Sequence, residues 1–247
     1  MIYAADTHIG NVRSMNQDAF LTFVKKDTDV LVVAVADGMG GHKAGNIASV
    51  LALETVRDFC DENADMDETL CALAAVDRAN SAVYTRATED ADCYGMGTTL
   101  SMAQIHQTDF LFSHVGDSRI YLLKLDGTFS RVTHDHSLVQ ELVDMGRINE
   151  QEASVHPQRN IITRAVGTAF DVEPDVGNVD WQKDEILLFC SDGLCGQIDD
   201  EKICSIIKEN EGDLRAACDA LIAAALEAGG TDNITVVLVK NCDEVNA

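Results

Sequence analysis

Two short apolar runs, far apart in the sequence, both lead to the dipeptide Asp-Gly. The first covers residues 31–36 and meets Asp37-Gly38, and the second covers residues 186–190 and reaches Asp192-Gly193 after one serine. Runs of this length that are rich in Val, Ile and Leu are typical of buried strands. A glycine after such a strand allows a sharp turn that brings its carbonyl close to a ligand. The sequence therefore predicts a carboxylate at the end of a rigid strand, twice.

Two further acids accompany apolar runs in the same way. Asp232 precedes the run 234–239, and Asp117 lies between the runs 110–115 and 120–123. Carboxylates collected at strand ends over an apolar core repel one another unless cations hold them, and hard divalent cations prefer oxygen ligands. The pattern predicts a divalent metal site.

Length and charge narrow the class of protein. The chain has 247 residues, only two prolines and no Gly/Ser-rich linker, so we expect one domain covering residues 1–247. It has 42 acidic and 18 basic residues, a formal charge of −24. This balance argues against binding to nucleic acid or to an anionic membrane, because both require basic patches. An acidic enzyme can still act on phosphate if it builds a local positive patch.

The cysteines and the apolar runs predict the compartment. The eight cysteines include no Cys-x-x-Cys spacing, which favours free thiols in a reducing cytosol. The N-terminus lacks a basic-then-apolar signal pattern, and the longest apolar runs are too short to cross a bilayer. We expect a soluble cytoplasmic protein with no membrane partner.

Periodicity indicates alternating groups of strands and helices. It predicts strands at 19–24, 30–36, 99–103, 110–115, 120–123, 129–132, 186–190 and 233–240. It predicts helices at 44–60, 66–88, 138–145, 200–210 and 212–228, the last ended by Gly229-Gly230. The polar stretch 146–160 is typical of an irregular surface flap. Strands in meanders and helices in pairs indicate an α+β fold of antiparallel sheets covered by helices.

Eight segments spread over nearly the whole chain carry a family pattern. They are Arg13-x-x-Asn16-Gln17-Asp18, Ala36-Asp37-Gly38-Met39-Gly40-Gly41-His42, Gly95-Met96-Gly97-Thr98-Thr99, Val115-Gly116-Asp117-Ser118-Arg119, Thr133-His134-Asp135-His136-Ser137, His156-Pro157-x-x-Asn160, Ser191-Asp192-Gly193-Leu194 and Thr231-Asp232-Asn233-Ile234-Thr235. With all eight in this order, the sequence closely resembles the metal-dependent protein phosphatases, the PPM or type 2C serine/threonine phosphatases, and in particular their compact bacterial members.

The resemblance implies a fold and a metal site. The fold would be a four-layer α-β-β-α sandwich, two antiparallel sheets flanked by antiparallel helices, with a flap subdomain at about residues 138–165. Two Mg²⁺ or Mn²⁺ ions would be bound by Asp37 as the bridging carboxylate and by the Gly38 carbonyl. Asp192 and Asp232 would complete the ligand set, together with Asp18 directly or through water. Asp117 would hold a third, weaker metal.

The resemblance also implies an activity: hydrolysis of phosphoserine and phosphothreonine in proteins by direct attack of a hydroxide shared by the two metals. Arg13 would bind the substrate phosphate, because its planar fork matches two phosphate oxygens. His42 would be the general acid that protonates the poor alkoxide leaving group. The implied partners are phosphorylated proteins, including a Ser/Thr kinase or its substrates, and the expected state is a monomer.

Structural explanations remain for several of these residues. An isolated Asp-Gly is usually a turn, and Asp126-Gly127 is interpreted that way. Asp117 could serve only as the polar tip of a hairpin, and His42 could start a helix without transferring a proton. His8 and Gln17 replace acids that many relatives carry, which weakens any contribution of these two positions to the metal site.

Two other functions stay open. One is a binding module that has kept the fold but not the activity, although such proteins normally lose one or more of the metal acids. The other is a phosphatase dedicated to one regulatory protein, such as an anti-sigma antagonist. Phosphopeptide selectivity would separate that enzyme from a broad-acting one.

Overall fold

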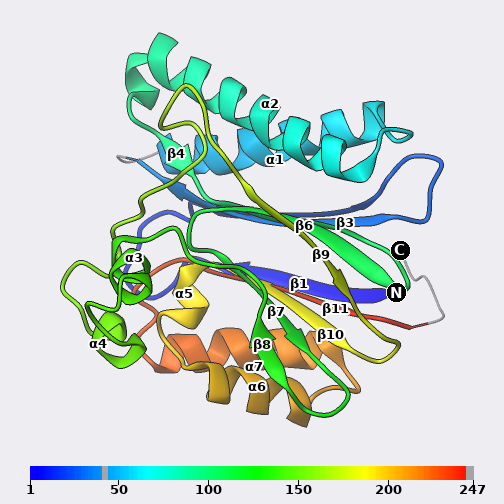
Figure 1. Ribbon diagram of the computed structural model, residues 1–247. Coiled ribbons are helices and arrows are strands. Elements are labelled where there is room, and N and C mark those ends of the chain that lie inside the picture. The colour runs from blue at the N-terminus through cyan, green and yellow to red at the C-terminus, as the bar shows by residue number, and fades with distance from the viewer. Residues whose placement is uncertain (41–43, 243–247) are drawn as a thin grey trace.

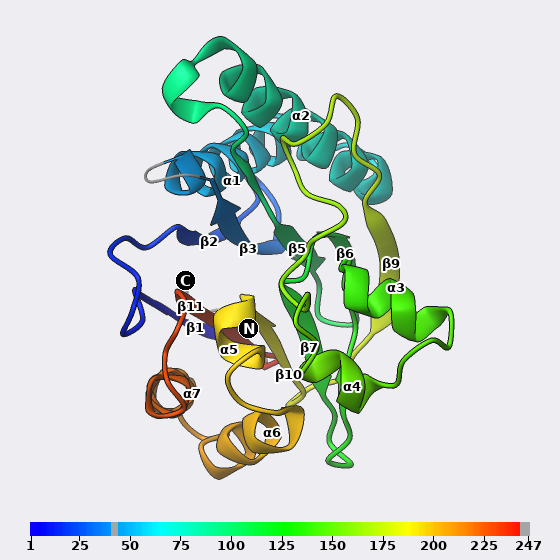
Figure 2. The same cartoon turned by 90° about the vertical axis from the view of Figure 1, so that its left-hand side faces the viewer.

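The computed structural model describes residues 1–40 and 44–242 and consists of four layers. Two sheets are stacked face to face, and a pair of helices covers the outer face of each (Figures 1 and 2). Every pair of neighbouring strands is antiparallel. The predicted α+β sandwich of two antiparallel sheets flanked by helices is confirmed.

The strands form two sheets whose order differs from their order in the chain. The first sheet consists, in spatial order, of β1 (Ile2–His8), β11 (Ile234–Lys240), β10 (Ile186–Cys190), β7 (Arg119–Leu123) and β8 (Phe129–Arg131). The second consists of β2 (Asp18–Val24), β3 (Leu31–Met39), β5 (Leu100–Ile105), β6 (Asp109–Val115) and β9 (Asp175–Asp180), with the short β4 (Gly97–Thr98) beside β3.

The helices divide between the two outer faces and the flap. Covering the second sheet are α1 (Ala44–Glu62) and α2 (Glu68–Glu89), and covering the first are α6 (Asp200–Glu209) and α7 (Leu214–Glu227). The flap contains α3 (Leu138–Asp144) and α4 (Glu150–Ser154), and the one-turn α5 (Asp192–Cys195) directly follows β10. No helix in the described ranges is long and apolar enough to cross a membrane.

The continuous apolar runs follow from burial on both faces of a strand. In β3, Val32 and Ala34 pack under α1 and α2, whereas Val33 and Val35 point into the layer between the sheets. A central strand that is covered on both sides loses the apolar–polar alternation of a half-exposed strand. This is why the central strands could be predicted from the sequence.

Three strands have no counterpart among the predicted ones: β1, β4 and β9. The first and third lie at sheet edges and are half-buried, so polar residues interrupt their apolar pattern, as Asp6 does in β1. The stretch 146–160 is also less irregular than expected. It contains α4, which Asn149 and Glu152 start with a reciprocal capping box.

Candidate active site: buried acids at one end of the sandwich

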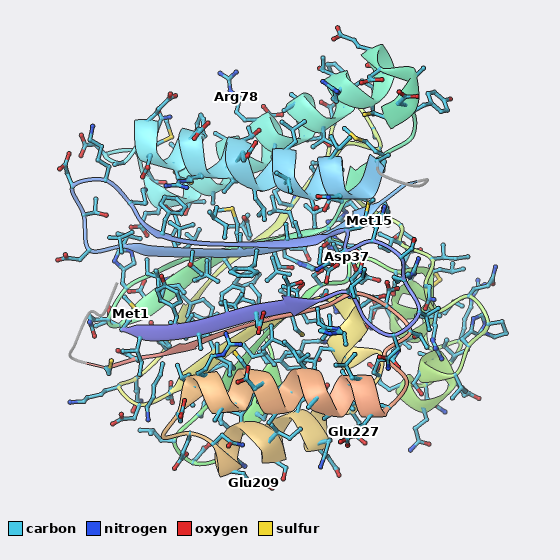
Figure 3. The ribbon with its side chains drawn as sticks, turned by 180° about the vertical axis from the view of Figure 1, so that it is seen from behind. Met1, Met15, Asp37, Arg78, Glu209 and Glu227 are labelled. Atoms are coloured by element: carbon cyan, nitrogen blue, oxygen red, sulfur yellow. The ribbon has the colours of Figure 1, made fainter. Side chains whose placement is uncertain are left out.

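Five acids predicted as metal ligands come from five separate segments and gather at one end of the two sheets. Antiparallel pairing places the start of one strand beside the end of its neighbour, so Asp18 at the start of β2 lies opposite Asp37 near the end of β3. In the other sheet, β10 ends and β11 begins at the same edge, which places Asp192 and Asp232 together. Asp117 lies in the tight turn between β6 and β7. Figure 3 shows Asp37 at this end.

Asp18 is held by hydroxyl groups from the opposite sheet. Its Oδ2 accepts hydrogen bonds from Ser191 Oγ and Thr235 Oγ1, both at 2.7 Å. Its Oδ1 is buried and has no hydrogen-bond partner. Burial raises the pKa of Asp18 to about 7, and the two hydroxyl hydrogen bonds oppose that rise. One oxygen is therefore fixed in place while the other is left for a ligand.

Asp37 is fixed through its backbone. Its N–H donates to Thr99 Oγ1 at 2.8 Å, and its carbonyl accepts from Thr98 Oγ1 at 3.0 Å. Burial raises the pKa of the Asp37 carboxyl well above its usual value, and the negative charges of Asp18 and Asp192 raise it further. The fold thus brings a rigidly held carboxylate into a region that already carries like charge.

The two glycines that follow the acids serve close packing and not a sharp turn. Contrary to expectation, β3 continues through Asp37-Gly38 to Met39, and neither Gly38 nor Gly193 has a positive φ. A Cβ on Gly38 would lie 2.0 Å from the carbonyl oxygen of Gly45 in α1, and one on Gly193 would lie 1.8 Å from that of Asn233. Only glycine permits these approaches.

Asp192 and Asp117 resemble Asp18 in having an unsatisfied oxygen. Oδ1 of each is buried without a hydrogen-bond partner. Burial raises the pKa of both carboxyls; the charge of Asp232 adds to the rise at Asp192, and the charge of Asp192 adds to the rise at Asp117. Orphaned buried oxygens are rare in folded proteins and need a partner.

Arg13 lies on the open side of the cluster. Its Nη2 donates to Asp232 Oδ2 at 2.6 Å, and the Arg13 side chain is 51% exposed. This bond uses one donor of a group that has five. His42 lies outside the described residues. His8 Nδ1 accepts from the Gly10 N–H, and Gln17 N–H donates to Asn233 Oδ1, so both stabilise loops beside the acids.

The residues present fit hard divalent cations. Three buried carboxylate oxygens have no hydrogen-bond donor, and the acids of the cluster repel one another. Divalent cations would bind these oxygens and neutralise the repulsion. In the part of the chain that the structure describes, no three His, Cys, Asp or Glu side chains form a ready-made metal cage.

Comparisons with known proteins bear on the same residues. The family model described as protein phosphatase 2C matches residues 6–229. The chain belongs to the protein phosphatase 2C family. It is an enzyme, a protein serine/threonine phosphatase of the 2C type.

Individual relatives cover almost the whole phosphatase. The serine/threonine phosphatase stp of Listeria welshimeri is 38% identical over 239 residues, covering 95% of this chain and 93% of its own. The crystal structure of the serine/threonine phosphatase PstP/Ppp of Mycobacterium tuberculosis has a TM-score of 0.88 at 37% identity, covering 97% of both chains. A structure of the PstP catalytic domain in complex with two manganese ions has a TM-score of 0.85 at 36% identity, with 97% of both chains covered.

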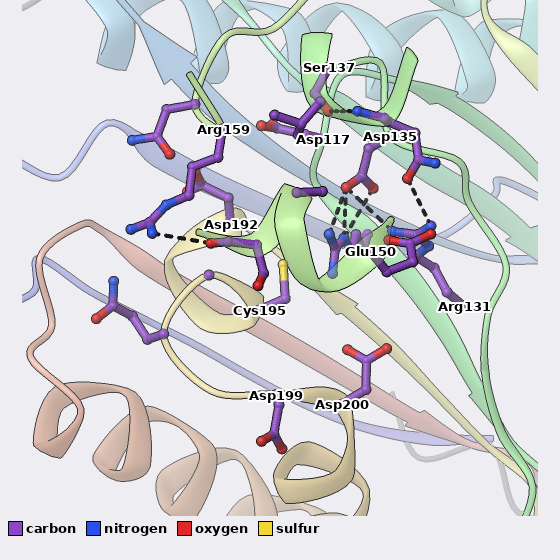
Figure 4. Close-up of a pocket in the computed structure, with 18 of the residues that line it drawn as sticks. Asp117, Arg131, Asp135, Ser137, Glu150, Arg159, Asp192, Cys195, Asp199 and Asp200 are labelled. Atoms are coloured by element: carbon purple, nitrogen blue, oxygen red, sulfur yellow. Dashed lines mark hydrogen bonds and ion pairs between the residues drawn. The ribbon is translucent and has the colours of Figure 1, made fainter. Parts of the chain in front are cut away.

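Beside the acids, the phosphatase has a cavity of about 630 Å³ between the flap and α5 (Figure 4). Arg119 lies in its wall. The Arg119 guanidinium donates hydrogen bonds to both carboxylate oxygens of Asp135 and to the Tyr121 hydroxyl, the last at 2.9 Å. Asp117 and Asp192 line the same cavity. The cavity therefore joins the acid cluster to the flap.

The residues that position the acids are the ones that sequence analysis missed. Ser191, Thr235, Thr98 and Thr99 all hydrogen-bond to Asp18 or Asp37. Each belongs to one of the family segments, but a short hydroxyl side chain gives no sign of which acid it will meet. His136 accepts the Gly116 N–H through Nδ1 and so supports the turn of Asp117.

Proposed function

We propose that this phosphatase hydrolyses phosphoserine and phosphothreonine monoesters in proteins with two Mg²⁺ or Mn²⁺ ions held at the acid cluster. Asp37 would bridge the two ions, with the Gly38 carbonyl, Asp192 and Asp232 as further ligands. Asp18 would complete the site directly or through water, and Asp117 would offer a third, weaker position. The observation that carries this proposal is the trio of buried carboxylate oxygens that have no hydrogen-bond partner.

The metals, when bound, would supply the positive charge that lowers the pKa of the attacking water and neutralises the phosphate. Arg13 would bind two phosphate oxygens through the guanidinium donors that Asp232 does not use. Ser191 and Thr235 would hold Asp18 in one orientation. His42 would give a proton to the leaving serine or threonine oxygen.

The cellular context is part of the proposal. Phosphoserine and phosphothreonine are products of Ser/Thr kinases, so the enzyme would oppose such a kinase in signal transduction, acting on the kinase or on its substrates. We infer a monomer with one catalytic domain over residues 1–247 and a flap at about residues 138–165. Eight free thiols are consistent with action in the reducing cytoplasm.

The deciding experiment measures hydrolysis of a phosphothreonine peptide with Mn²⁺ and with a chelator. Wild type and Asp37→Ala would be compared with Asp126→Ala, which alters an Asp-Gly pair in an exposed turn. Activity that needs both the metal and Asp37, and that survives Asp126→Ala, supports the proposal. Inactivity of the folded wild type under every condition contradicts it and favours a silent binding module.

A further inference from the structure

A buried lysine lies at the other end of α1 from the acids. Lys25, in the turn between β2 and β3, is 2% exposed. Its Nζ contacts Gln104 Oε1 at 3.0 Å and Cys71 Sγ at 4.0 Å. Among the ion pairs of the described residues, none includes Lys25. A buried ammonium without an anion is costly, so the groups around it need to supply the opposite charge.

The groups that can do so are two thiols. Cys60 Sγ in the last turns of α1 and Cys71 Sγ in the first turn of α2 are 3.8 Å apart, and both residues are fully buried. The hydrogen bond between the thiols lowers the pKa of Cys71 to about 7 against the opposing effect of burial, and the charge of Lys25 lowers it further. Of the nearby acids, Glu68 is bound to His106 at 2.6 Å. Cys71 is thus the ionisable thiol in contact with Lys25 Nζ.

We propose that Cys60 and Cys71, with Lys25 as the positive charge beside them, form a redox-active dithiol that hydroperoxides oxidise to a disulfide between α1 and α2. The Cys71 thiolate attacks the peroxide, an S–O bond forms and the O–O bond breaks. Sulfur is oxidised to a sulfenic acid, and the peroxide is reduced to water or an alcohol. The Cys60 sulfur then attacks Cys71 sulfur, and the departing hydroxide leaves as water with the Cys60 proton.

The surroundings permit both steps. Lys26 and Asp61, the chain neighbours of Lys25 and Cys60, line a surface cavity of about 550 Å³, but neither cysteine does, so a small oxidant would reach the buried sulfur atoms only after a local opening of this region. The sulfur atoms need to close from 3.8 Å to the ~2.05 Å of a disulfide bond. Both are near the ends of antiparallel helices joined by a short loop, where such a shift requires little rearrangement.

The position of the dithiol decides its effect. Cys60 is 15 residues along α1 from Gly45, which packs against Gly38, and at 1.5 Å per residue this is about 22 Å. A disulfide there crosslinks the two helices without entering the acid cluster. Oxidation should therefore change the stability of the phosphatase and leave its turnover within about twofold.

The test is peptide mapping of the full chain. Reduced protein is treated with hydrogen peroxide at pH 7, quenched with an alkylating reagent and digested without reductant. A Cys60–Cys71 crosslinked peptide is expected. Lys25→Met should slow its formation by about two- to threefold, because it removes the positive charge that adds to the effect of Cys60 on the Cys71 pKa, whereas Lys26→Met in the same turn should not. Alkylated Cys60 and Cys71 after treatment, or equal rates in the two lysine variants, would overturn the proposal.

A second measurement covers the case in which Lys25→Met does not fold. The melting temperature of oxidised wild type should rise by about 5–10 °C and return on reduction, because the bond constrains the unfolded chain. Cys60→Ser should show no rise and should leave a sulfenic acid on Cys71 that dimedone traps. A melting temperature unaffected by oxidation, or no trapped sulfenic acid, contradicts the proposal. Neither readout depends on turnover, so the result is separate from the test of the proposed function.

Discussion

The two ends of the layer formed by β3 and α1 bury charges of opposite sign. At one end five acids are brought together, and the basic side chain seen to pair with them is Arg13 through Asp232. At the other end one ammonium, that of Lys25, is buried beside two thiols. Among the described residues, the acid end has an excess of negative charge, which suits cations taken from solution. At the lysine end, the groups in contact with the ammonium are the Cys71 thiol and the Gln104 amide.

This contrast shows which buried charges serve the catalytic site. The acids leave oxygen atoms without partners, and these atoms lie against a cavity next to the flap. Lys25 has two polar contacts, and in the described structure its neighbours are side chains of β5 and α2. Changes at the acid end should therefore alter activity, and changes at the lysine end should alter stability and thiol chemistry.

The largest expected effect is at the acid end. Asp192→Asn should lower turnover of a phosphothreonine peptide by at least about a thousandfold, because an amide replaces a carboxylate whose buried oxygen would bind metal. Asp126→Asn is the matched control, since it alters an Asp-Gly pair far from the cluster, and it should keep full activity. Comparable loss in both variants, or none in either, would contradict the role of the acid end.

Arg13 should have the next largest effect. Arg13→Lys keeps a positive charge beside Asp232 but loses the planar fork, so kcat/KM should fall by about 10- to 100-fold. Steady-state kinetics would show most of this loss in KM. Arg215→Lys, which alters another half-exposed Arg–Asp pair outside the acid cluster, is the control. An unchanged KM in Arg13→Lys would exclude phosphate binding by Arg13.

The pH dependence of stability without metal should reveal the uncompensated acids. Burial raises the pKa of Asp18 to about 7 in the folded state, above the ~3.9 of an unfolded chain. The folded state then binds the proton more tightly, so this contribution to stability is complete below pH ~4 and is lost as the pH rises through about 7. In a chelator, the melting temperature should be several degrees lower at pH 8 than at pH 5.

Metal and mutation should each remove that dependence. Saturating Mn²⁺ binds the folded state and should raise the melting temperature most at pH 8, where the carboxylates are ionised. Asp18→Asn should flatten the pH profile in the chelator. If the wild type is equally stable at both pH values without metal, the acids are not raised as the structure indicates.

The smallest effect is expected at the lysine end. Lys25→Met removes the donor of the buried Gln104 Oε1, so the free energy of unfolding should fall by about 1–3 kcal/mol. Phosphatase activity should stay within about twofold. Urea unfolding of Lys25→Met and of the surface control Lys26→Met would measure the difference. A large loss of activity in Lys25→Met would contradict the conclusion that the lysine end does not affect catalysis.

The sequence was sufficient for the features that depend on local order. Asp37, Asp192 and Asp232 could be predicted to lie at strand ends because each is beside a run that is buried on both faces, and a continuous apolar run can be recognised in the sequence. Their role as metal ligands stays a proposal. The edge strands β1 and β9 could not be predicted, because half-exposed strands tolerate polar residues. The family segments contain both the acids and the hydroxyl groups that orient them, but they do not show which hydroxyl group contacts which acid.

What only the tertiary structure decided depends on contacts between distant segments. Ser191 and Thr235 meet Asp18 from 173 and 217 residues away, and no local pattern encodes such a pairing. Lys25 lies in a polar turn and has the sequence of an exposed residue. The packing of α1, α2 and β5 around that turn is what excludes water from it and makes two ordinary cysteines its neighbours. Burial is a property of the whole fold, and it changes the chemistry of a side chain that the sequence alone leaves in solvent.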